Sequence, residues 1–189
     1  MTVKIAIDGP AGAGKSTVAK KLAKLLNYTY IDTGAMYRAI TYKAIQEKVN
    51  LIEENKIADI AQSADIILEG EKIFLDGKDI SEEIRKPGVS EKVSLVSKIP
   101  KVREILVQKQ RKIAEGKNVV MDGRDIGTVV LPDAQFKFFL TASLEERAKR
   151  RYRELKTKNV NVSYYEVLKE IENRDTIDSQ RDTSPLKNC

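Results

Sequence analysis

Hydrophobic and polar positions follow two different periods along this chain. Val3–Ile7 is a short apolar run without clean alternation, which is typical of a strand buried on both faces of a parallel sheet. Similar runs stand at Tyr28–Ile31, Val119–Met121 and Phe136–Leu140. Between them, apolar residues recur three or four positions apart, as on one face of a helix. This alternation predicts an α/β fold, with a parallel sheet flanked by helices.

End signals mark several of the predicted helices. Ser97–Pro100 begins a long helix, and Gly116 lies just past its end. Ser143–Glu146 and Ser163–Glu166 are capping boxes that open two more helices. The other helical patterns cover Val18–Leu26 and Ala35–Lys48.

The period changes between Asp65 and Ile80. Ile66–Leu68 and Ile73–Leu75 are short β-type runs, and Gly-containing turns separate and follow them. This pattern predicts a small antiparallel meander. Because a meander interrupts the strand–helix alternation, we interpret Asp65–Pro87 as an insert.

The segment after the first strand matches the phosphate-loop pattern G-x-x-x-x-G-K-[ST] at every fixed position, and a helix follows it. Glycines let consecutive N–H groups curve around an anion, and the helix N-terminus adds positive partial charge. Lys15 is expected to reach the β- and γ-phosphates, and the Ser16 hydroxyl to coordinate Mg²⁺. We therefore expect a P-loop NTPase-type fold that binds ATP through Gly9, Pro10, Ala11, Gly12, Ala13, Gly14, Lys15, Ser16 and Thr17.

Composition narrows the chemistry. The 189 residues predict one domain, and the net charge of +6 favours anionic partners such as nucleotides, nucleic acids or acidic membranes. The chain has no histidine, which excludes a histidine base or metal ligand. Its single cysteine, Cys189, excludes an intramolecular disulfide and is expected to be inert. No apolar run approaches the ~18 residues that cross a bilayer, so we expect a cytoplasmic protein without membrane contact.

A phosphate loop alone leaves NTPases and small-molecule kinases open, although no N-K-x-D guanine signature occurs. Asp122 ends a predicted strand, where an acidic residue can orient Mg²⁺; an ordinary strand-end turn is an equal alternative. Arginine forks bind phosphate, and ligands bind at the carboxyl edge of such sheets. Six arginines outside the basic helix, several of them near predicted loop or strand ends, therefore indicate a second phosphate: Arg38, Arg85, Arg103, Arg124, Arg174 and Arg181.

Two charge patterns have more than one interpretation. Arg174, Asp178 and Arg181 are spaced to share one helix face, either toward a site or as an ion-pair ladder in solvent. The helix after Ser143 is strongly basic, which suits a nucleic-acid surface, a solvated face or a lid over ATP. The neighbouring phosphate loop favours the lid. The basic residues of this helix are Arg147, Lys149, Arg150, Arg151, Arg153, Lys156 and Lys158.

Five segments, spread in order over essentially the whole chain, together resemble the bacterial cytidylate kinase family. They are Asp8–Ser16, Asp32–Arg38, Pro100–Arg103, Asp122–Val130 and Arg174–Arg181. The second and fourth are far more specific than the phosphate loop. The resemblance implies ATP-dependent phosphorylation of CMP, and of dCMP, with Mg²⁺. It also implies a core near residues 1–37, 97–145 and 170–189, a monophosphate-binding lobe with the β insert near 38–96, and a helical lid near 146–169.

The resemblance implies roles for individual residues. We assign catalytic roles to Lys15, Asp122, Arg124 and Arg181, and we expect Arg150 to reach ATP from the lid. The acceptor phosphate would be held by Arg38, Arg124 and Arg181, with Thr33 helping to seat it. Arg174 and Asp178 would lie near the sugar and the phosphates. The cytosine ring would be read by Ser94, Arg103 and Asp125.

Cytosine chemistry agrees with that last assignment. Its N4 amino group donates beside the N3 and O2 acceptors, so a carboxylate can accept from N4 while an arginine or hydroxyl donates. Uracil has an acceptor, O4, in place of the N4 donor, and a donor, N3–H, in place of the N3 acceptor. A buried polar group that loses its hydrogen-bond partner in this way costs about 1–3 kcal/mol. A 5′-monophosphate is already ionised at pH 7, so no histidine base is needed.

Two alternatives remain open: a kinase for UMP, AMP or a small metabolite, and a nucleic-acid-binding protein that uses the basic helix. The second leaves Asp125 and Asp178 without a role. We expect ATP and CMP or dCMP as partners, no nucleic acid, and a monomer. Family members usually continue past Ser184–Leu186 into a further strand and helix, so we expect this sheet to lack an edge strand.

Overall fold

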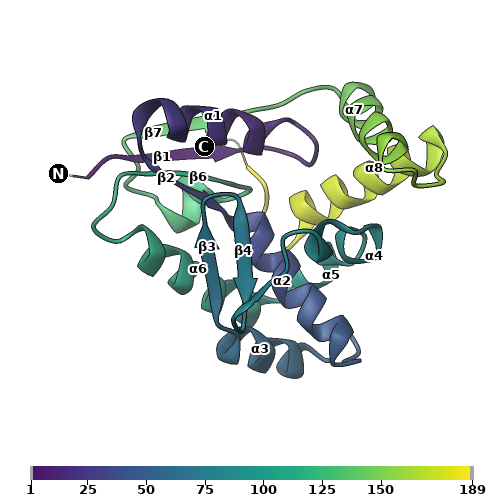
Figure 1. The fold of residues 1–189 in the computed structure, drawn as a ribbon, viewed down its shortest axis with the longest axis horizontal. Helices are drawn as coiled ribbons and strands as arrows, with labels where there is room; N and C mark the ends of the chain where they lie inside the picture. Colours follow the sequence, from purple (N-terminus) through teal and green to yellow (C-terminus); the bar gives the residue numbers. More distant parts are fainter. Residues whose placement is uncertain (1, 188–189) are drawn as a thin grey trace.

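The main sheet has four parallel strands in the order β2-β6-β1-β7. The computed structural model describes residues 2–187 (Figure 1), so the expectation for Cys189 lies outside the described residues. Helices cover both faces of this sheet, which confirms the predicted P-loop NTPase-type α/β fold. The strands are β1 (Lys4–Asp8), β2 (Thr29–Asp32), β6 (Val119–Gly123) and β7 (Phe136–Phe139).

Alternate side chains of the central strands pack on opposite faces of the sheet. Ile5 and Ile7 of β1 belong to a buried cluster with α1 (Lys15–Leu26). Ala6 belongs to a second cluster, formed with α6 (Pro100–Ala114) and the π-helical turn η2 (Ile126–Val130). Because both faces of β1 and β6 are buried, these strands are continuous apolar runs in the sequence.

Strand β7 lies at the edge of the sheet, paired with β1 alone among the described strands. The prediction of a buried strand at Phe136–Leu140 is wrong in this respect, because Phe136 and Phe138 are each 52% exposed. No further strand of the described residues pairs with the outer edge of β7. Its outer backbone groups are therefore unpaired within residues 2–187.

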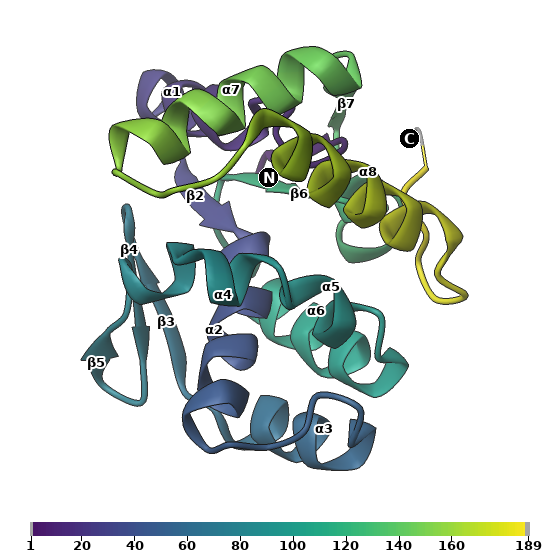
Figure 2. The same ribbon diagram turned by 90° about the vertical axis from the view of Figure 1, so that its right-hand side faces the viewer.

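The predicted insert is part of a separate lobe, which lies below the main sheet in Figure 2. Its antiparallel sheet β3-β4-β5 confirms the predicted meander. One buried cluster joins the insert to α2, α3 and the apolar side of α6. The elements of the lobe are α2 (Thr33–Gln46), α3 (Glu54–Ser63), β3 (Ile66–Glu69), β4 (Lys72–Leu75), β5 (Lys78–Asp79), η1 (Glu83–Arg85), α4 (Pro87–Ser90) and α5 (Val93–Ser97).

The long helix α6 begins at Pro100, so the predicted start at Ser97 is wrong. Ser97 is the last residue of the short helix α5. Ile99 is extended, with φ −68° and ψ 116°, because a residue before proline is driven out of the helical region. Proline itself fits the first helical turn, where no N–H partner is needed.

Helices α7 (Leu144–Thr157) and α8 (Tyr164–Gln180) pack against each other with a small core of their own. Figure 2 shows this pair above α4 and α5. Ser163 forms a complete capping box with Glu166, whereas Ser143 accepts only the Glu146 N–H, so the prediction of a second complete box is wrong. Within residues 2–187, no helix is long and apolar enough to cross a membrane.

Candidate active site

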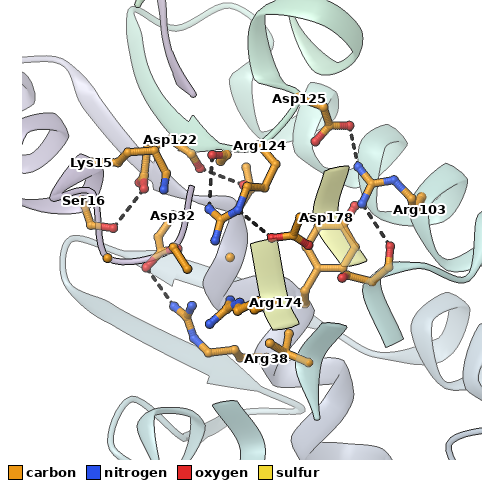
Figure 3. Close-up of a pocket in the computed structure, with 18 of the residues that line it drawn as sticks. Lys15, Ser16, Asp32, Arg38, Arg103, Asp122, Arg124, Asp125, Arg174 and Asp178 are labelled. Atoms are coloured by element: carbon orange, nitrogen blue, oxygen red, sulfur yellow. Dashed lines mark hydrogen bonds and ion pairs between the residues drawn. The ribbon is translucent and has the colours of Figure 1, made fainter. Parts of the chain in front are cut away.

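A pocket opens at the carboxyl ends of β2 and β6, beside the phosphate loop, where ligands bind in open α/β sheets. Figure 3 shows charged side chains converging on it. Predicted residues for both substrates therefore share one pocket. Those that line it are Ala11, Gly12, Lys15, Ser16, Thr33, Arg38, Arg103, Asp122, Arg124, Asp125, Arg174, Asp178 and Arg181.

The phosphate loop has a backbone conformation that its glycines permit. Gly9 has a φ of +146°, and a β-carbon there would lie 2.0 Å from the carbonyl oxygen of Leu140. Gly14 has a φ of +94° and directly precedes α1, whose first residues line the pocket. No side chain of the described residues caps this helix, so its first N–H groups are available to an anion.

The ammonium group of Lys15 is held inside the loop. Its Nζ donates to the carbonyl oxygen of Pro10 at 2.7 Å. Burial lowers the pKa of Lys15 and Arg124 lowers it further, whereas Asp122 raises it. A phosphate that replaced the Pro10 carbonyl would supply the negative charge that this buried ammonium group lacks.

Asp122 connects the loop to the sheet. Ser16 Oγ donates to Asp122 Oδ2 at 2.9 Å, and Tyr30 Oη donates to Oδ1 at 2.7 Å. Burial and the nearby Asp32 carboxylate raise the pKa of Asp122 to about 6. A hydroxyl beside a carboxylate is a donor set that suits Mg²⁺, which usually takes its other ligands from substrate phosphates and water. Within residues 2–187, no group of three or more His, Cys, Asp or Glu side chains could hold a metal.

Three arginines gather across the pocket from the loop. Arg38 pairs with Asp32 at 3.1 Å, and Arg124 pairs with Asp178 at 2.9 Å. Arg174 forms no ion pair among the described residues, and its buried Nε has no hydrogen-bond partner there. Burial, together with Arg124 and Arg38, lowers the pKa of Arg174 to about 10. A buried guanidinium whose charged form is disfavoured by burial and by neighbouring arginines indicates a site for an anion.

The far end of the pocket holds a buried guanidinium–carboxylate pair. Arg103 Nη2 donates to Asp125 Oδ2 at 2.5 Å, and Nη1 donates to the carbonyl oxygen of Ser97 at 3.1 Å. The Arg103 guanidinium lies 5.3 Å from the ring centre of Tyr37. Arg181 Nη2 approaches Asp125 Oδ1 at 3.9 Å. Hydrogen-bond donors and a carboxylate acceptor thus lie side by side, away from the phosphate loop.

Only two of the three residues predicted to share one helix face, Arg174, Asp178 and Arg181, lie on a helix. Arg174 and Asp178 lie on α8, but Arg181 follows its last residue in extended backbone, with φ −64° and ψ 142°. The prediction of one helix face is therefore wrong for Arg181. All three side chains still line the pocket, so the ion-pair ladder in solvent is excluded as their arrangement.

Other predicted residues lie outside this pocket. Ser94 lines a neighbouring cleft beside the lid, because α5 turns Val93 and Ser97 toward the main pocket instead. Thr17 and Arg85 line a cleft that adjoins the phosphate loop. The roles of Ser94 and Thr17 stay predictions.

Two lid arginines lie beside the phosphate loop. Arg147 is buried, donates to the carbonyl oxygen of Ala11 at 3.0 Å and pairs with Asp175 at 2.5 Å. Arg150 is exposed, and its Nη1 would lie 3.7 Å from a β-carbon on Gly14. Arg147 therefore links the lid to the phosphate loop, whereas the contact of Arg150 with ATP stays a prediction.

Sequence reasoning missed several groups of this site. Asp32 ends β2 and partners Arg38, and the strand-end signal that indicated Asp122 could have found it. Tyr30 and Tyr37 carried no such signal, because a tyrosine in an apolar pattern looks like a core residue. Asp175 was indistinguishable from other acidic residues on a solvated helix.

A phosphate loop, a strand-end carboxylate and an arginine-rich pocket under a helical lid define a P-loop nucleotide kinase. The family model described as cytidylate kinase matches residues 5–189, and the chain belongs to this family, which confirms the resemblance. A cytidylate kinase of Caldanaerobacter subterraneus subsp. tengcongensis is 74% identical over 186 residues, which cover 98% of this chain and 83% of the relative. The cytidylate kinase of Bacillus subtilis is 53% identical over 189 residues, which cover 98% and 84%.

Proposed function

We propose that this protein transfers the γ-phosphoryl group of ATP to the 5′-phosphate of CMP, and also to that of dCMP. The observation that carries the proposal is one pocket with positively charged groups at two of its sides. The phosphate loop with Lys15 forms one side, and the arginines around Arg174 form the other. The relatives named cytidylate kinase support the choice of acceptor.

On the donor side, the loop N–H groups and Lys15 bind the triphosphate. Lys15 exchanges its bond to the Pro10 carbonyl oxygen for bonds to the phosphate oxygens. Ser16 and Asp122 would hold Mg²⁺, directly or through its waters. When bound, the ion neutralises charge on the phosphate oxygens.

On the acceptor side, Arg38, Arg124 and Arg174 bind the monophosphate dianion, and the predicted contribution of Arg181 stays a prediction. Arg38 and Arg124 are paired with carboxylates in the free protein. The phosphate dianion would supply the negative charge and the hydrogen-bond acceptor that Arg174 lacks. Arginine forks make charge-assisted, bidentate bonds to phosphate, which fix the direction of the nucleophilic oxygen. Positioning of this kind supplies most of the rate enhancement in phosphoryl transfer.

The base is selected by Asp125 and Arg103. Asp125 accepts from the cytosine amino group, and the arginine donates to a ring acceptor. Uracil would turn its O4 toward the Asp125 carboxylate, so both groups would be left without a partner. A loss of this kind costs about 1–3 kcal/mol, which is roughly a 10- to 100-fold preference for cytosine.

The test is ADP release, measured by a coupled assay, with CMP, dCMP, UMP, AMP and GMP as acceptors. We expect CMP and dCMP to give the highest kcat/KM, and UMP to be at least about 10-fold poorer. Strict dependence on added Mg²⁺ is expected. Higher activity with AMP or GMP than with CMP, or ADP release that needs no acceptor, would overturn the proposal.

A further inference from the structure

The carboxylate of Asp8 is fully buried and faces the turn that follows Asp125 rather than the phosphate loop. Asp8 is the last residue of β1 and directly precedes the phosphate loop. Its Oδ1 accepts the N–H of Ile126 at 2.8 Å, and its Oδ2 accepts the N–H of Gly127 at 2.8 Å. The two acceptors of one side chain therefore hold two successive backbone donors.

We propose that Asp8 is the positioning residue for Asp125, and through it for the choice of base. This inference rests on the proposed function, since Asp125 is there the group that reads the acceptor. Asp125 immediately precedes the two residues that Asp8 holds, so these two bonds fix the backbone from which its side chain extends, while Arg103 holds the carboxylate itself. The same segment carries Arg124, which the proposed function assigns to the acceptor phosphate.

The local backbone explains why the two hydrogen bonds to Asp8, together called the Asp8 clamp, are needed. Asp125 is outside regular structure, with φ −144° and ψ 29°. On its carboxyl side, its carbonyl oxygen accepts from Val129 and Val130, which closes the turn η2. On its amino side, β6 ends at Gly123, two residues earlier. Without Asp8, the first N–H groups of the turn would be buried without partners, and the turn would have to shift to satisfy them.

The energetic cost of Asp8 also indicates a positioning role. A carboxylate that is 0% exposed, with no ion pair among the described residues, is unfavourable unless its hydrogen bonds require it. Burial and the nearby Asp125 raise the pKa of Asp8, whereas the two backbone N–H groups lower it. An asparagine would keep the shape but offer one acceptor, and its amide N–H₂ would oppose a backbone donor.

The test is Asp8→Asn, with steady-state kinetics for CMP, UMP and ATP. We expect kcat/KM for CMP to fall at least about 10-fold and the CMP-to-UMP ratio to fall about 10-fold, since one buried donor loses its acceptor. KM for ATP is expected to change less than about 3-fold, because no bond of this carboxylate goes to the phosphate loop. The matched control is Asp133→Asn, which makes the same chemical change at an exposed ion pair with Lys4.

An unchanged CMP-to-UMP ratio in a folded Asp8→Asn protein, with equal losses for both acceptors, would overturn the inference. A second measurement uses the wild-type protein and does not depend on the variant. Amide hydrogen exchange of Ile126 and Gly127, followed by NMR without nucleotide, should be as slow as in β6; exchange at loop rates would overturn the inference. Wild-type protein that does not phosphorylate CMP would instead overturn the proposed function, and the exchange result would still report on the clamp.

Discussion

At the residue scale, the arginine side of the pocket holds positive charge that is unfavourable in the folded protein without an anion. Arg174 is crowded by Arg124 and Arg38, and its lowered pKa means that its charge is more costly in the folded protein than in the unfolded chain. We expect Arg174→Met to increase the free energy of unfolding of the unliganded protein by about 1 kcal/mol. The same change should raise KM for CMP about 10- to 100-fold, because a charge-assisted bond to phosphate is lost. Urea denaturation and steady-state kinetics check the two effects.

The matched control for this prediction is Arg153→Met on the exposed side of α7. It removes the same charge without touching the pocket, so neither stability nor KM for CMP should change appreciably. A clear loss of stability in Arg174→Met would contradict the idea that this charge is unfavourable before the acceptor binds.

Asp125 offers a second prediction at this scale. Asp125→Ala removes the carboxylate proposed to accept from the cytosine amino group, and it leaves the buried Arg103 guanidinium without its partner. We expect kcat/KM for CMP to fall about 100-fold, while the Kd of ATP changes less than about 3-fold. Acceptor kinetics and ATP titration by calorimetry measure the two quantities. Asp133→Ala is the exposed control, and undiminished CMP turnover in Asp125→Ala would show that this carboxylate does not read the base.

At the element scale, the end of β6 is packed so tightly that only glycine fits. A β-carbon on Gly123 would lie 2.6 Å from both Ile126 Cδ1 and Thr33 Oγ1. We expect Gly123→Ala to lower the free energy of unfolding by about 1–3 kcal/mol, because η2 or α2 must shift to make room. Gly88→Ala in α4 is the control, since a β-carbon there would meet no atom within 4 Å. It should be neutral or stabilising by up to about 1 kcal/mol. Equal midpoints of urea unfolding for the two variants would contradict the packing argument.

The elements also indicate how far sequence patterns reach. β1 and β6 could be predicted because their burial on both faces makes them continuous apolar runs. β7 has an equally apolar sequence at Phe136–Leu140, yet it is an edge strand, because strand order depends on tertiary pairing that no local pattern encodes.

The candidate site follows the same division. The phosphate loop could be predicted from the sequence, because its backbone conformation requires glycines at fixed spacing. Asp122 could be proposed as a site residue because it ends a predicted strand. The partners that complete the site, such as Tyr37 under Arg103 and Asp8 beneath Ile126, lie far away in sequence, and only the fold brings them into contact.

At the scale of the whole molecule, the pocket lies where three separately packed regions meet. The main sheet, the lobe and the lid each have their own buried cluster. Helices α6 and α8 are shared between them: α6 contributes to both the lobe and the sheet clusters, and α8 carries lid residues and pocket residues alike. Relative movement of these regions would therefore change the pocket without unfolding any of them.

Arg147 is the side chain through which the lid is fastened to the phosphate loop. It extends from α7, donates to the Ala11 carbonyl oxygen and pairs with Asp175 of α8, while Asp175 accepts the Ala11 N–H at 3.4 Å. We expect Arg147→Met to raise KM for ATP about 10-fold and to increase acceptor-independent ATP hydrolysis, because a loosened lid excludes water less completely. KM for CMP should change less than KM for ATP. Arg153→Met, on the same helix but exposed, should leave both constants unchanged. Equal increases in KM for CMP and for ATP in Arg147→Met would show that this link serves stability alone. A selective increase in KM for ATP would show that the lid and the phosphate loop act as one unit in binding ATP.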